Sequence, residues 1–134
     1  MKFPHINFFK KNFIRQLAQS HEYTICDLFS GHGIGTLLHM PPMVNHVGKT
    51  ISQSSSCFIF FFLANSSPDF MVPGMAFTIE PIALMQTPTN YYLWKDNFTL
   101  IPIPRMPSAQ WEHTIVINET GHEVITKRSN ENIE

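Results

Sequence analysis

Residues 111–118 read WEHTIVIN, and they carry the clearest strand signal in the chain. Isoleucine, valine and threonine dominate the stretch, and β-branched residues favour extended backbone. The run Glu119-Thr120-Gly121 follows as a turn, and residues 123–126 (EVIT) again have strand composition. Two such strands on either side of a short glycine-containing turn predict an antiparallel hairpin.

Upstream of this hairpin, residues 75–80 read MAFTIE and predict a second strand after the turn-forming Val72-Pro73-Gly74. The stretch between these two predicted strands is rich in proline, which cannot donate a hydrogen bond to a sheet ladder. Loops and edge strands are therefore expected there. The prolines concerned are Pro88, Pro102, Pro104 and Pro107.

The first third of the chain predicts one helix and a glycine-rich turn. Residues 7–20 place apolar side chains at the spacing of one helical face. Residues 22–29 then predict a short strand that leads into a turn over residues 31–35 (GHGIG). The Pro41-Pro42 pair excludes a helix after that turn.

Length and composition predict one folded domain over residues 1–134, with both helix and strand (α/β or α+β). Hydrophobic residues make up 43% of the chain and charged residues 14%, which disfavours disorder. Residues 51–64 fit least well, because a polar stretch there runs into CFIFFFLA. Three readings of this apolar insert stay open: a buried strand, an aggregation-prone edge, or sequence foreign to the fold.

The charge balance excludes two classes of partner. A formal net charge of −1 gives no overall field that would attract nucleic acid or anionic lipid. The longest apolar run, residues 57–64, is far shorter than the roughly 20 residues of a membrane-spanning helix. Neither a nucleic-acid nor a membrane partner is expected.

The two cysteines indicate a reducing compartment. Cys26 and Cys57 lie in unlike surroundings and show no CxxC spacing, so reduced thiols and a cytoplasmic location are the preferred reading. The residues before Glu22 include basic side chains and no acid, which resembles a weak organellar presequence. A basic surface helix explains the same pattern, and an organellar location is the alternative.

A small set of residues has the chemistry of a metal site. His32 lies between two glycines, Glu80 ends an apolar strand, and Glu112 begins another. Carboxylates at the ends of buried strands are costly unless something pairs with them. One histidine and two glutamates could hold Mn, Fe, Co or Zn and leave a position open for water, which is the pattern of catalytic metal sites.

Each of these residues also has a plainer reading. His32 is then a polar residue in a turn, and His39 a surface or hydrogen-bonded histidine. Glu80 is a solvated strand end, and Glu112 pairs with His113 or a nearby cation. The remaining histidines show no metal-type grouping and are read as ordinary surface residues. They are His5, His21, His46 and His122.

Taken in order, four segments resemble the C-terminal half of a type I methionine aminopeptidase. The segments are GHGIG (residues 31–35, followed by His39 and Pro41-Pro42), VPGMAFTIEP (72–81), SAQWEHT (108–114) and GHEVIT (121–126). The resemblance runs from about Phe13 to Lys127, apart from the apolar insert. It implies half of the pita-bread (creatinase/aminopeptidase) fold, with a curved antiparallel sheet and helix packing. Hydrolases of the creatinase and Xaa-Pro types match these segments less well.

The resemblance also implies a role for each candidate. His32 and Glu80 are metal ligands, and Glu112 is the carboxylate that bridges two metals. His39 is catalytic, because it contacts the substrate and stabilises the reaction intermediate. Phe98 helps to wall the substrate methionine pocket.

The implied activity is removal of the initiator methionine from nascent polypeptides, with the nascent N-terminus as substrate and the ribosome as a further partner. The family holds two divalent ions per site (Co, Mn, Fe or Zn), and two aspartate ligands come from its N-terminal half. Nothing upstream of Gly31 matches those aspartates, so at most one ion is expected here. The alternative is a catalytically inactive, truncated homologue that binds peptide or protein, or an unstable fragment from a faulty gene model.

Overall fold

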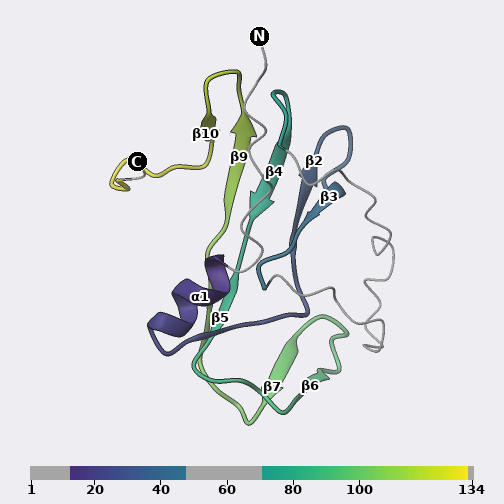
Figure 1. Ribbon diagram of the computed structural model, residues 1–134. Coiled ribbons are helices and arrows are strands. Elements are labelled where there is room, and N and C mark those ends of the chain that lie inside the picture. The colour runs from purple at the N-terminus through teal and green to yellow at the C-terminus, as the bar shows by residue number, and fades with distance from the viewer. Residues whose placement is uncertain (1–12, 48–70, 133–134) are drawn as a thin grey trace.

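The computed structural model describes residues 13–47 and 71–132 (Figure 1). These ranges hold one short helix, α1 (Phe13–Ser20), and a series of short strands. The strands are β1 (Thr24–Ile25), β2 (Gly31–Ile34), β3 (Met40–Val44), β4 (Ala76–Ile79), β5 (Ile82–Leu84), β6 (Asn90–Leu93), β7 (Leu100–Ile103), β8 (Ser108–Gln110), β9 (His113–Ile117) and β10 (His122–Val124).

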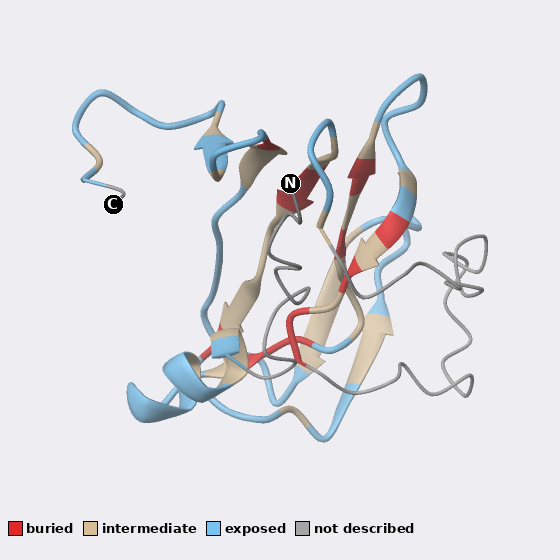
Figure 2. Ribbon diagram, turned by 45° about the horizontal axis from the view of Figure 1, so that its top comes forward, coloured by how far each residue is buried: buried red, intermediate tan, exposed pale blue. Residues whose placement is uncertain are grey.

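A five-stranded antiparallel sheet forms the centre of the structure, in the order β10-β9-β4-β2-β3 (Figure 1). Its core is apolar and small, with Val44, Phe77 and Ile117 buried at its middle. Figure 2 shows that buried residues gather on these central strands, whereas α1 is largely exposed. The two predicted strands on either side of the proline-rich stretch are confirmed as β4 and β9. In the sheet, β4 lies between β2 and β9.

The antiparallel pairing of β4 with β9 stops and then resumes as a second ladder. The first ladder ends at the pair Ile79 and His113, and the next, between β5 and β8, begins at the pair Ile82 and Gln110. The gap therefore sets residues 80–81 opposite residues 111–112. Both candidate glutamates lie in this gap. β5 and β8 belong to a three-stranded sheet with β1, and β6 and β7 form a separate hairpin.

The predicted turn over residues 31–35 is wrong, because Gly31–Ile34 is strand β2 in the middle of the sheet. The glycines serve close packing instead. A Cβ atom on Gly31 would lie 2.2 Å from the Thr78 carbonyl oxygen, and one on Gly33 would lie 2.2 Å from the Pro41 carbonyl oxygen. Only a residue without a side chain lets these backbones approach so closely.

The other elements agree with the sequence in kind and differ in extent. The helix is confirmed over residues 13–20, where it packs against β1, and residues 7–12 of the predicted helix lie outside the described residues. The C-terminal hairpin is confirmed, although β9 begins at His113 and its partner ends at Val124. The apolar insert, with Cys57, lies outside the described residues. No helix in the described part of the chain is long enough to span a membrane.

Substituting Gly31 by alanine tests this reading of the glycines. We expect G31A to lower the free energy of unfolding by about 2 kcal/mol or more, because the new methyl group meets backbone that must move. The matched control is G121A, in the β9–β10 turn, where an added Cβ meets nothing within 4 Å. G121A should stay within about 0.5 kcal/mol of the unaltered chain. Urea unfolding followed by circular dichroism measures both, and equal losses would contradict the argument.

Candidate metal centre

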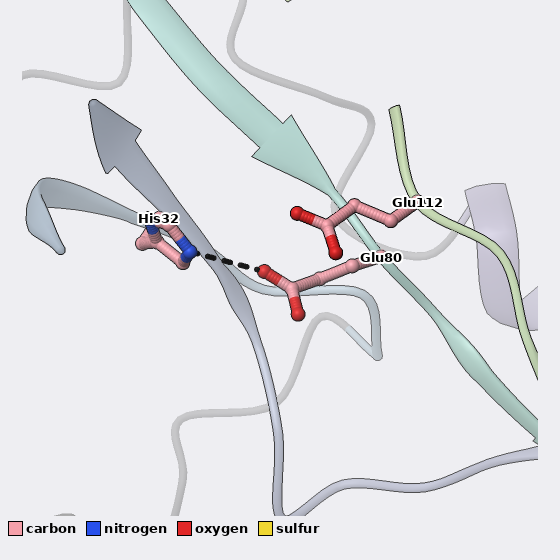
Figure 3. Close-up of side chains that lie close together, drawn as sticks. All are labelled: His32, Glu80 and Glu112. Carbon is pink, nitrogen blue, oxygen red and sulfur yellow. Dashed lines mark ion pairs between the residues drawn. The ribbon is translucent and has the colours of Figure 1, made fainter. Parts of the chain in front are cut away.

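Three side chains from separate parts of the sequence converge beside the central sheet (Figure 3). His32 comes from β2, Glu80 directly follows β4, and Glu112 directly precedes β9. One ligand-type atom from each lies within 4.8 Å of the others. The convergence follows from the strand order, because β2 and β9 flank β4 on its two sides.

The hydrogen bonds of His32 define which ring nitrogen faces the group. Nδ1 lies 3.1 Å from the Gly33 carbonyl oxygen, which can only accept, so Nδ1 carries the hydrogen. Nε2 then points at Glu80 Oε1, at 3.4 Å (Figure 3). In a neutral imidazole this places a lone pair against a carboxylate oxygen. Such a pair is stable only with a cation between the two atoms, either a proton on Nε2 or a metal ion.

The spacing fits a divalent ion. Ligand atoms at about 2.1 Å from a tetrahedral ion are about 3.4 Å apart, which is the distance between His32 Nε2 and Glu80 Oε1. Glu112 is exposed and needs only a small side-chain movement to complete the group. The imidazole and carboxylate donors suit Zn, Mn, Fe or Co. His32, Glu80 and Glu112 therefore fit a single divalent ion.

The buried hydroxyl of Thr78 links the first two members of the group. Thr78 is 1% exposed. Its Oγ1 donates to Glu80 Oε1 at 2.7 Å and accepts the His32 N–H at 3.0 Å. The side-chain amide of Gln110 approaches Glu80 Oε2 and the Glu80 carbonyl oxygen, each at 3.4 Å. Both oxygens of the Glu80 carboxylate are thus oriented before any ion binds.

The prediction that His46 is a surface residue is wrong. His46 is 3% exposed, and its Nε2 accepts the backbone N–H of Glu80 at 3.2 Å. Burial lowers the pKa of His46 from 6.5 to about 4, so the ring is neutral at pH 7. In the structure, His46 continues the alternation of buried positions set by Pro42 and Val44, so the period of two beyond β3 is the signal that could have found it. Of the other three, His21 and His122 are exposed as predicted, and His5 lies outside the described residues.

His39 and Phe98 differ in their relation to the group. The ring of His39, in the β2–β3 loop, lies 4.3 Å from the ring of His32, centroid to centroid. His39 is exposed and stands next to the group. Phe98 is 88% exposed on the β6–β7 hairpin. The roles of both residues stay predictions.

Glu112 pairs with neither His113 nor a cation of the described residues, which was the plainer reading of that residue. His113 Nε2 instead accepts from the indole N–H of Trp111 at 2.9 Å, and Nδ1 contacts Thr126 Oγ1 at 3.1 Å. Within residues 13–47 and 71–132, the Glu112 carboxylate has no hydrogen-bond or ion-pair partner. Its carboxylate is available to a ligand from solvent.

A histidine and two carboxylates that meet at strand ends, one of them exposed, have the form of a catalytic metal centre. The chain belongs to metallopeptidase family M24, which it matches over residues 11–119. This match over most of the chain supports the resemblance to methionine aminopeptidases that the four motifs suggested.

Individual relatives carry the same name. The chain is 35% identical over 114 residues to methionine aminopeptidase 1B, chloroplastic, of Arabidopsis thaliana, which covers 85% of this chain and 26% of the relative. It is 36% identical over 117 residues to methionine aminopeptidase 1 of Dictyostelium discoideum, covering 87% and 28%. The chain thus spans about a quarter of the length of these curated relatives.

Solved structures agree on the fold. A methionine aminopeptidase from Rickettsia prowazekii has a TM-score of 0.65 at 28% identity, covering 84% of this chain and 40% of that one. A methionine aminopeptidase from Thermotoga maritima has a TM-score of 0.72 at 24% identity, covering 96% and 45%. The predicted fold class, part of a pita-bread architecture, is confirmed.

Replacing Thr78 tests the link between His32 and Glu80. We expect T78V to lower the free energy of unfolding by about 1–3 kcal/mol, because valine keeps the shape but leaves the His32 N–H without its acceptor. The control T78S retains the hydroxyl and should lose less. Chemical denaturation of both variants gives the comparison. A T78V chain as stable as T78S would show that the hydroxyl is dispensable.

Proposed function

We propose that this chain carries the metal-binding portion of a methionine aminopeptidase, which removes the N-terminal methionine from nascent proteins. The convergence of His32, Glu80 and Glu112 is the observation that carries the proposal. The names of the relatives support the substrate assignment. Residues 1–134 would form a single partial domain of this fold, with residues 51–64 as an insert.

His32, Glu80 and Glu112 would hold one divalent ion, Co, Mn, Fe or Zn. When bound, such an ion supplies Lewis-acid polarisation and lowers the pKa of water toward neutrality. The Thr78 and Gln110 contacts keep the Glu80 carboxylate in position, so ordering this ligand costs little on binding.

The remaining chemistry falls to two exposed side chains. Glu112 has an exposed carboxylate, without a partner among the described residues, that can accept a proton from the attacking water. His39, beside the His32 ring, can donate a hydrogen bond to the peptide carbonyl oxygen as negative charge develops there. Phe98 would contribute to an apolar slot for the methionine side chain.

The substrate would be the free N-terminus of a nascent polypeptide, and the ribosome would be the place of encounter. A cytoplasmic location is proposed. An organellar location is the alternative, because relatives named as chloroplastic and mitochondrial match the chain about as well as the others.

Metal binding tests the site directly. Calorimetric titration with Co²⁺ or Mn²⁺ should give one ion per chain. E80Q should weaken binding at least about 10–100-fold, since even the loss of outer contacts around a metal has this effect. The matched control, E123Q, changes an exposed glutamate on β10 and should bind as the unaltered chain does. Equal affinity in E80Q and E123Q would refute the site.

Peptide hydrolysis tests the activity. We expect the 134-residue chain to cleave Met-Ala-Ser poorly or not at all with saturating Co²⁺, because its described residues bring together a single group of three ligand-type side chains. Release of methionine, followed by a coupled assay, measures the rate. Turnover equal to that of a full-length methionine aminopeptidase would contradict this expectation.

A second function deserves a test on the same sample. The exposed Glu112 carboxylate beside His32 and Glu80 would also suit a non-catalytic module that binds a peptide N-terminus. Fluorescence anisotropy with a labelled Met-Ala-Ser peptide distinguishes the two. Binding without turnover, reduced by E112Q, would favour the module.

A further inference from the structure

We propose that His46 is a positioning residue for the metal centre. Its imidazole accepts a hydrogen bond from the backbone N–H of Glu80, and this contact fixes the position of the Glu80 carboxylate. The inference rests on the proposed metal centre and adds a residue that is neither a ligand nor in contact with substrate.

The main chain at Glu80 needs such support because it lies in the gap between two ladders. Strand pairing with β9 ends at Ile79 and pairing of β5 with β8 begins at Ile82. Pro81 has no N–H. Glu80 therefore supplies the one backbone donor of this two-residue stretch, and that donor goes to His46 Nε2 at 3.2 Å.

His46 is itself tied to the strand that carries the other ligand. It follows β3, whose Met43 is the register partner of His32 on β2. The Asn45 side chain accepts the Val47 N–H at 2.9 Å, which bends the chain around His46. At 3% exposure the ring has little freedom to move. A short path of contacts thus runs from His32 through the β2–β3 ladder to His46 and on to Glu80.

Two contacts then fix Glu80 at opposite ends. Thr78 Oγ1 holds the carboxylate, at 2.7 Å, and His46 holds the backbone nitrogen. With both ends fixed, Oε1 stays within 3.4 Å of His32 Nε2. Loss of the backbone contact would leave a partly buried N–H without its acceptor and let the carboxylate move from the position that the ion requires.

Two amide substitutions test the inference, because they differ only in reach. In H46Q the amide oxygen can occupy the position of Nε2, whereas in H46N it falls short, near the position of Nδ1. Calorimetric titration with Co²⁺ should show H46N binding about 10–100-fold more weakly than the unaltered chain. H46Q should recover most of that loss. The controls H122N and H122Q, on exposed β10, should bind unchanged.

A second measurement reports the contact without metal. Amide hydrogen exchange by NMR should be faster at Glu80 in H46N than in H46Q, while the core amide of Phe77 stays protected in both. Equal Co²⁺ affinity in H46N and H46Q, whether high or low, would overturn the inference. An unaltered chain that binds no Co²⁺ would instead refute the proposed metal centre, and a slow Glu80 amide in H46N would then overturn the positioning contact as well.

Discussion

The Nε2 atom of His32 and the Oε1 atom of Glu80 face each other at 3.4 Å across the β2–β4 strand pair. Both atoms can donate a lone pair to a cation. A neutral His32 ring that donates from Nδ1 to the Gly33 carbonyl oxygen has no hydrogen on Nε2 to donate to Glu80. Thr78 and Gln110 hold the carboxylate in the same position. The sheet therefore fixes two candidate ligands in a geometry that would suit a bound cation, and the other candidate residues lie around this pair.

The strand pairing explains how both glutamates reach the same place. Within continuous ladders, strand side chains alternate between faces and backbone groups pair with each other. At residues 80–81 and 111–112 the two ladders break opposite one another. The freed backbone at Glu80 is paired with a side chain, and Glu112 is left exposed. The register is the same on both sides of the break, with Ile79 opposite His113 and Ile82 opposite Gln110, so Glu80 and Glu112 lie opposite each other at the edge of an apolar core.

Local composition predicted the secondary structure that depends on residues adjacent in sequence. The motif resemblance predicted which residues would form the metal site. The strands β4 and β9 and the C-terminal hairpin followed from β-branched runs and a glycine turn. His32, Glu80 and Glu112 were named from the sequence, and the structure brings them within 4.8 Å. The glycines of residues 31–35 were misread as a turn, because the Thr78 carbonyl that requires Gly31 is distant in sequence. His46 was missed for the same reason, since its partner is the backbone N–H of Glu80, which is distant in sequence.

The broken ladder also determines where this chain can change its length. Loops such as β2–β3 and β6–β7 join neighbouring strands, and added residues there leave the pairing of β4 with β9 intact. One extra residue between Thr78 and Pro81 would turn the Glu80 side chain to the other face of the sheet, because strand side chains alternate with a period of two. The same holds for Glu112 on the opposing strand. A change of length is therefore compatible with the strand pairing at the β6–β7 hairpin end, and it disrupts the site at the two short gaps that carry the acids.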